Sequence, residues 1–182
     1  MLRHCIVAGA IALVSGQLYA ASSQYSELYG KSCKLIDLDK GSGASTRRCS
    51  GVGGFSLLVH EANAQTSVDI VTPAGSVYPL EYWEVVTPGL SRVGRKAEWR
   101  MEQRDGRMEP AALLVRLDTS NLGTHGPRLA AGSILTAARI ERDGACVVYQ
   151  GDARPRSADA QARAAAADPR AKCLGVYKTS AR

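Results

Sequence analysis

The amino-acid sequence predicts a mainly β protein: an antiparallel sandwich or partly open barrel of about seven strands, with one alanine-rich helix near the C-terminus. Three observations lead to this fold class. Short runs that alternate apolar and polar residues recur between glycine- and proline-rich turn signals. Two Asp-Gly dipeptides, at Asp105 and Asp143, each separate two such runs, as in a tight β-hairpin. The one alanine-rich stretch, residues 157–167, is followed by Pro169, which ends a helix.

The first twenty residues, MLRHCIVAGAIALVSGQLYA, have the layout of a secretory signal peptide. Arg3 and His4 form a short positive start, residues 6–14 are apolar, and Ala20 supplies a small residue for cleavage. The apolar run is shorter than the roughly 20 residues that a membrane anchor needs; a buried N-terminal helix is the alternative. We therefore expect residues 1–20 to be a signal peptide. Residues 21–182 should form a single disulfide-stabilised β-rich domain, periplasmic or secreted, without a transmembrane segment.

Removal of the signal peptide leaves four cysteines, Cys33, Cys49, Cys146 and Cys173. An even number of cysteines in an exported protein predicts two disulfides, for which three pairings are possible. Pairing of neighbours, Cys33 with Cys49 and Cys146 with Cys173, is favoured because each pair brackets a segment with its own strand or helix pattern. A zinc site is the alternative, but no C-x2-C or H-x3-H spacing is present.

The first half of the exported chain predicts three strands and a glycine-flexed loop. Residues 22–32 are polar and predict a turn of helix or a loose arm. Residues 40–48 predict a loop, because glycine, serine and threonine dominate there. Strands are expected at residues 34–38, 55–61 and 65–73, the last two as a hairpin. The aromatic stretch 78–86 lies between prolines, which confine any strand there to an edge or a short piece.

The second half predicts two hairpins and the helix. Residues 96–102 alternate cleanly, with Ala97, Trp99 and Met101 on one face, and residues 111–117 return after the Asp105-Gly106 turn. Because Pro110 cannot donate to the ladder, we expect the pairing to shift there. Residues 134–142 and 145–150 form the second hairpin through a two-residue turn, with Cys146 on its outer face. A Cys146–Cys173 disulfide would then tie the helix across that face.

Motifs of catalytic sites fail at named positions. Gly30-Lys31-Ser32 resembles the end of a phosphate-binding loop, but Tyr25 stands where a glycine is required. His60-Glu61 resembles the start of a zinc-protease helix, but Ala64 stands where the second histidine is required. No G-x-S-x-G motif is present. The sequence therefore predicts no catalytic residue, no metal ligand and no cofactor. The alternative is a periplasmic hydrolase or isomerase that uses His60 or His125.

The chain is basic, with a formal net charge of +6, and its cations are mainly arginine. One interpretation is an electrostatic surface for anionic envelope material, such as phospholipid headgroups, lipopolysaccharide or acidic glycans. The other is composition alone, because alanine and arginine are both heavily used. Nucleic acid is excluded as a partner by the expected compartment and by the absence of a basic-aromatic sheet motif.

The candidate binding surface combines the first disulfide loop with the aromatic stretch. Its residues are Lys40, Arg47, Arg48, Tyr82 and Trp83. The two aromatic residues are either an exposed patch or a cap on the core. The predicted function is that of an exported non-enzymatic module that binds an envelope component or another exported protein.

Two stretches carry a resemblance to other proteins: CKLIDLDKGSGASTRRCSGVGG near the N-terminus and CVVYQGDARPRSADAQARAAAADPRAKC near the C-terminus. In these stretches the chain resembles small uncharacterised exported bacterial proteins with two disulfides. Those proteins have a Cys-loop-Cys unit followed by a glycine-rich strand, and an alanine- and arginine-rich helix between two late cysteines. The resemblance implies export and the pairing of neighbouring cysteines, and it implies no activity.

Overall fold

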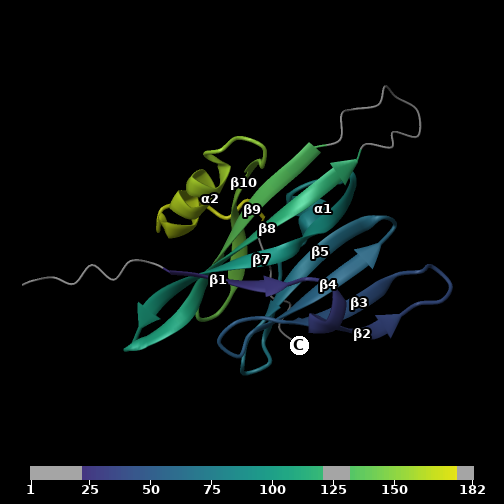
Figure 1. The fold of residues 1–182 in the computed structure, drawn as a ribbon, viewed down its shortest axis with the longest axis horizontal. Coiled ribbons are helices and arrows are strands. Elements are labelled where there is room, and N and C mark those ends of the chain that lie inside the picture. Colours follow the sequence, from purple (N-terminus) through teal and green to yellow (C-terminus); the bar gives the residue numbers. More distant parts are fainter. Residues whose placement is uncertain (1–21, 121–131, 176–182) are drawn as a thin grey trace, which may run out of the picture.

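The computed structural model describes residues 22–120 and 132–175, and in this part of the chain ten strands form two antiparallel sheets (Figure 1). Sheet A has the order β1 (Ser22–Glu27), β7 (Leu90–Arg104), β8 (Arg107–Ser120), β9 (Gly132–Ile140) and β10 (Ala145–Asp152). Sheet B has the order β2 (Cys33–Leu38), β3 (Ser45–Ser50), β4 (Ser56–Ala62), β5 (Gln65–Val71) and β6 (Val77–Pro79). The mainly β class is confirmed, the sheets do not form a closed barrel, and the expected number of about seven strands is too low.

The two sheets share one hydrophobic core. Trp99, Leu113 and Val115 contribute to it from sheet A, and Leu57 and Ile70 from sheet B; all five are at most 1% exposed. The alternation predicted for residues 96–102 and 111–117 is thereby confirmed, because the same faces are buried. Inward-facing apolar residues from both sheets bury each other, which is the main source of stability in a β-sandwich.

Strand β1 replaces the loose arm or helical turn that the sequence suggests for residues 22–27. It pairs with β7 in the register Ser22↔Met101 to Glu27↔Lys96. Its serines, glutamine and glutamate have no apolar periodicity, so only pairing with β7 makes this segment a strand. A single 3-10 turn, Gly30–Ser32, then leads into β2.

The segment between the first two cysteines is a hairpin and not a long loop. Strand β3 begins at Ser45, so the loop is reduced to residues 39–44, where the amide of Gly43 donates to the carbonyl of Asp39 at 2.8 Å. Cys33 and Cys49 lie directly opposite each other in the β2–β3 register and form a disulfide. The second disulfide joins Cys146 to Cys173, so the predicted pairing of neighbouring cysteines is confirmed.

The first Asp-Gly hairpin has the predicted two-residue turn. Asp105 and Gly106 have φ values of 49° and 79°, as a type I′ turn requires, and Arg104 pairs with Arg107. The ladder shifts by one residue where Met101 meets Pro110, as expected for a residue without an amide donor.

The second Asp-Gly hairpin differs from the prediction. Ile140 pairs with Ala145 and not with Val147, so the turn contains the four residues 141–144. The amide of Glu141 donates to the carbonyl of Gly144 at 2.8 Å, which closes this wider turn. Because the register moves by two residues, Cys146 still lies on the outer face, now opposite Arg139.

The aromatic stretch 78–86 forms two short elements. Strand β6 is an edge of sheet B, as the prolines require, and is followed by the short helix α1 (Tyr82–Val85). Glu81 adopts a left-handed conformation with φ of 45°, which turns the chain into α1. Only the short piece before Leu80 is therefore a strand, and residues 82–85 are helical.

Helix α2 (Ala158–Ala167) lies on the face of sheet A that points away from sheet B (Figure 1). Ala158, Ala162 and Ala166 recur every four residues and are buried against an outer cluster that includes Leu114 and Leu135. The helix ends before Pro169, as predicted. Alanine side chains bury little area, so packing alone holds α2 weakly and the Cys146–Cys173 disulfide supplements it.

We expect the variant Cys146→Ser/Cys173→Ser to loosen α2 before the rest of the protein. Closing a loop of this length stabilises by about 3 to 4 kcal/mol on the chain-entropy account, and α2 has little apolar area to compensate. Hydrogen exchange should show amides of α2 losing protection while amides of β4 and β5 keep theirs. The matched variant Cys33→Ser/Cys49→Ser should instead loosen β2 and β3. Uniform loosening of both sheets in the first variant would contradict this account.

The two disulfides are consistent with an extracellular or periplasmic protein. Within residues 22–120 and 132–175, no helix has the length and apolar character to cross a bilayer. The predicted signal peptide, residues 1–20, lies outside the described residues.

Candidate functional site

The residues of the predicted binding surface do not lie on one surface. Arg47 and Arg48 are neighbours in β3, so their side chains point to opposite faces of sheet B, while Lys40 is in the exposed turn before them. Tyr82 is fully buried in the core, which agrees with the interpretation of a cap on the core and rules out an exposed patch at this residue; burial raises the pKa of its hydroxyl. Trp83 is half-buried, and its indole nitrogen donates to Glu81 at 2.7 Å.

Arg47 lies in a large open pocket between the two sheets, with a volume of about 1090 Å³. Its guanidinium is 2.8 Å from the carboxylate of Glu61, and β7 and β8 contribute Arg92 and Asp118 to the opposite wall. Burial raises the pKa of the Tyr29 hydroxyl, which donates to a backbone carbonyl of β7 at 3.0 Å. The lining thus mixes both signs of charge, and Arg47 is already neutralised by Glu61.

His60 stands in a hydroxyl–imidazole–carboxylate array across three strands of sheet B. Its Nε2 donates to Asp69 Oδ2 at 2.8 Å, and its Nδ1 is 3.1 Å from Thr46 Oγ1, whose hydroxyl donates when the ring is neutral. The hydrogen bond to Asp69 raises the pKa of His60, burial lowers it, and the charges of Asp69 and Glu81 raise it further. The array comes from cross-strand neighbours, since Thr46 and His60 are register partners.

The array lies within the β-ladder of sheet B. Thr46 is in the middle of the sheet, paired with Asp37 in β2 and with His60 in β4. Thr46, His60 and Asp69 do not line the pocket that contains Arg47. His125, the other histidine considered for catalysis, lies outside the described residues.

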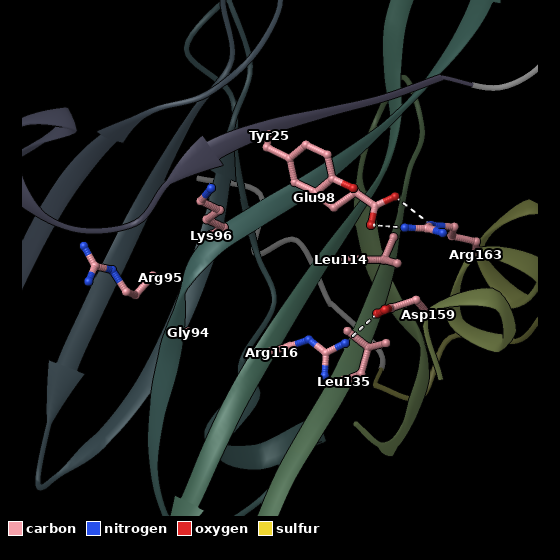
Figure 2. A pocket seen from close by; sticks show the side chains of 10 residues that line it. All are labelled: Tyr25, Gly94, Arg95, Lys96, Glu98, Leu114, Arg116, Leu135, Asp159 and Arg163. Atoms are coloured by element: carbon pink, nitrogen blue, oxygen red, sulfur yellow. Dashed lines mark hydrogen bonds and ion pairs between the residues drawn. The ribbon is translucent and has the colours of Figure 1, made fainter. Parts of the chain in front are cut away.

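A second pocket, the α2 groove, lies between the outer face of sheet A and helix α2 (Figure 2). Its volume is about 340 Å³, within the usual range of small-ligand sites. Tyr25 of β1 is 57% exposed at its edge, and Leu114 and Leu135 form its floor. Arg163 and Asp159 of α2 form one wall, and Arg95 and Lys96 stand on the opposite side.

A bulge in β7 places these two cations at the groove. Val93 pairs with Leu117 and Ala97 with Val115, so three residues of β7, Gly94 to Lys96, face the single residue Arg116 of β8. Such a bulge turns side chains out of the regular alternation. Gly94 permits it, because a Cβ there would lie 3.3 Å from the backbone oxygen of Arg116.

Two ion pairs connect α2 to sheet A across the groove. Glu98 accepts two hydrogen bonds from Arg163, at 2.7 and 2.8 Å, and Arg116 donates to Asp159 at 2.7 Å. Burial raises the pKa of the Glu98 carboxyl, but hydrogen bonds from Arg163 and Ser23 and the nearby guanidinium charges lower it by more, so the net pKa is below its usual value. Glu98 is therefore ionised and structural at neutral pH.

The cations of the bulge are left to face solvent. Both carboxylates of the groove are bonded to the guanidinium groups of Arg163 and Arg116. No hydrogen bond or ion pair joins the Arg95 side chain to another residue of the described part, and Lys96 is 64% exposed and 3.6 Å from Glu27. The groove thus carries an excess of positive charge on its β7 side.

One feature of the sequence indicates part of this site, the bulge in β7. In the run Arg92–Val93–Gly94–Arg95–Lys96, a glycine interrupts the alternation directly before two cations. A glycine within a strand pattern indicates a bulge. Tyr25 and Arg163 carry no such signal, because pairing and helix docking alone bring them to the groove.

Comparisons with known protein families, curated proteins and solved structures find no match for this chain. Within the described residues, no group of three or more His, Cys, Asp or Glu side chains is placed to hold a metal ion.

Proposed function

We propose that the protein is an exported, non-enzymatic binding module that holds an anionic group of envelope material in the α2 groove. The observation that carries this proposal is the bulge of β7, which places Arg95 and Lys96 at the rim of a groove whose own carboxylates are already paired. The Arg95 side chain has no hydrogen bond or ion pair within the described residues, and Lys96 has only an exposed contact with Glu27. Exposed cations at an open site attract an anionic ligand.

The ligand chemistry follows from the remaining lining. Tyr25 offers an exposed aromatic face, on which a sugar ring or a glycerol backbone can lie, beside the two cations. Leu114 and Leu135 are 3% and 2% exposed, so the floor offers little room for an acyl chain. The ligand is therefore an anionic headgroup or an acidic sugar, with phosphate or carboxylate as the shared chemistry.

The export of the protein belongs to this proposal. The two disulfides support a periplasmic or secreted location, and the leader-like sequence of residues 1–20 supports the same compartment. Anionic lipid headgroups and acidic glycans are abundant there, whereas nucleic acid is not expected.

The double variant Arg95→Ala/Lys96→Ala tests the proposal. We expect it to weaken binding to vesicles of phosphatidylglycerol and phosphatidylcholine about 30-fold at low salt, since each cation near an anionic surface contributes about 1 kcal/mol. Heparin serves as the soluble acidic glycan, and comparison of the two probes separates lipid from glycan. Binding should weaken further as salt is added, because exposed charges are screened.

The matched control is Lys40→Ala/Arg107→Ala, which removes the same charge from exposed positions outside the groove. This control should bind as the wild type does. Loss of binding in the control variant alone would place the binding site at Lys40 or Arg107, outside the groove, and would overturn the proposal. Hydrolysis of p-nitrophenyl acetate that disappears in His60→Ala would instead support the hydrolase alternative built on Thr46, His60 and Asp69.

A further inference from the structure

The edge of sheet B formed by β2 is open and apolar. Strand β2 pairs only with β3, and five of its six residues are exposed. Leu35, Ile36 and Leu38 are 53%, 53% and 48% exposed. An exposed edge strand with large aliphatic side chains is a template for pairing with another strand.

The other three edges in the described part of the two sheets are protected. Strand β1 is mostly polar, and β6 has only three residues and ends at Pro79, which cannot donate to a ladder. The free edge of β10 is occupied, because the amide of Leu174 donates to the carbonyl of Val147 at 2.8 Å. Strand β2 alone combines six residues with a run of exposed aliphatic side chains.

A bulge in β2 places two opposite charges on one face. Lys34 pairs with Arg48 and Asp37 with Thr46, while Ile36 has no register partner. Arg48 and Thr46 are two residues apart on β3 and so share a face. Lys34 and Asp37 therefore share that face too, although residues three apart in a regular strand would point to opposite sides.

We propose that a second copy of this chain pairs with β2 edge to edge, antiparallel, about a two-fold axis that passes between Leu35 and Ile36. In this register Lys34 of each copy lies directly opposite Asp37 of the other copy, on the same face of the joined sheet. Leu35 and Ile36 of the two copies meet at the centre. Opposite charges across an antiparallel pair stabilise it, and the contact is self-complementary, as a two-fold interface requires.

The bulge also explains why the partner is a second copy and not an arbitrary strand. A bulge disrupts the register of a regular strand that approaches the edge, which is one way in which edges are protected. A second β2 strand has its own bulge at the same position, with the same two residues, Leu35 and Ile36, between its charged residues. The spacing between Lys34 and Asp37 is therefore the same in both strands, and the charged pairs align on both sides of the axis. The bulge thus disfavours pairing with a regular strand and favours pairing with a second β2 strand.

Charge reversal tests the pairing. Lys34→Asp alone places like charges opposite each other twice across the axis, and so does Asp37→Lys alone. We expect each single variant to raise the dimer dissociation constant on the order of tenfold, measured by sedimentation velocity over a range of protein concentrations. The double variant Lys34→Asp/Asp37→Lys restores opposite charges and should regain the wild-type dissociation constant.

Two further variants complete the test. Ile36→Lys should leave the protein monomeric, and Arg107→Asp, at an exposed turn of sheet A, should dimerise as the wild type does. All these positions are exposed, so circular dichroism should show the same fold throughout. A wild-type protein that stays monomeric at high concentration would overturn the proposal, as would a dimer that the reversals leave unchanged or that the double variant fails to restore.

Discussion

Replacing Trp99 with alanine should lower the free energy of unfolding by about 3 to 5 kcal/mol, the range for truncating a fully buried aromatic residue. Trp99 is 0% exposed at the centre of the core between the sheets. Its ring packs near Phe55, the residue before β4, with centroids 6.0 Å apart, and its Nε1 donates to Ser26 Oγ of β1 at 2.8 Å. The substitution thus leaves a cavity where three segments meet. Urea unfolding followed by circular dichroism measures the loss.

Two other substitutions separate size from hydrogen bonding. Trp99→Phe keeps most of the ring but leaves the Ser26 hydroxyl without its donor, so a smaller loss of about 1 to 2 kcal/mol is expected. Trp83→Ala removes the second, half-buried tryptophan and serves as the matched control. If Trp99→Ala were no more destabilising than Trp83→Ala, Trp99 would not be the central core residue.

The sequence predicted those parts of the fold that local pattern determines. Residues 97, 99 and 101 alternate with charged residues, and the structure buries that face. The Asp105-Gly106 dipeptide requires positive φ at both positions, and it adopts them. In this hairpin the alternation of the strand and the preference of the turn residues predict the same structure, which is why the sequence alone was enough to predict it.

The missed strands have little pattern of their own. Strand β1 reads SSQYSE and β3 reads STRRCS, and neither alternates apolar with polar residues. Both are strands because neighbouring strands supply their hydrogen-bond partners, a property of the tertiary fold. The two-residue turn predicted at the second Asp-Gly dipeptide is wrong for another reason: the tight turn and the four-residue turn place Ile140 and Val147 on the same buried face, so the apolar pattern cannot distinguish them.

The site was harder to predict than the fold, because the groove takes residues from five elements. Tyr25, Lys96 and Arg163 are far apart in sequence, and β1, β7 and α2 bring them together. Cysteine count was informative, since it led to the disulfide that fixes α2. The number of basic residues was not informative, because it does not distinguish a paired arginine from an unpaired one. Arg163 is bonded to Glu98, whereas the Arg95 side chain has no hydrogen bond or ion pair within the described residues.

A dimer through β2 would also place two α2 grooves on one side of the assembly. The proposed two-fold axis is perpendicular to sheet B, so sheet A of both copies lies on the same side of the joined sheet. The two α2 grooves, on the outer faces of sheet A, would then face the same way. Binding of a surface that displays many anionic groups would gain from two linked sites, without any new contact.

Replacing Glu98 with glutamine should cost about 2 kcal/mol at neutral pH, within the range for hydrogen bonds to charged groups. The Glu98 side chain is 10% exposed and joins β7 to α2 through Arg163 and to β1 through Ser23, whose hydroxyl donates at 2.6 Å. Arg163 is 37% exposed and can regain water, which keeps the loss below that of a fully buried pair. The matched control is Glu102→Gln on the same strand, where the carboxylate is exposed and the loss should be small.

The pH dependence of this loss distinguishes an ion pair from simple packing. The pKa of Glu98 in the folded protein lies below its usual value of 4.5, because its partners stabilise the ionised form more than burial destabilises it. A carboxyl with a lowered folded-state pKa contributes its full stability above the unfolded-state pKa and loses it as the pH falls through the folded-state pKa. The difference in unfolding free energy between wild type and Glu98→Gln should therefore be constant near neutrality and shrink below about pH 4.5. A difference that persists unchanged into strong acid would show that Glu98 acts by shape and not by charge.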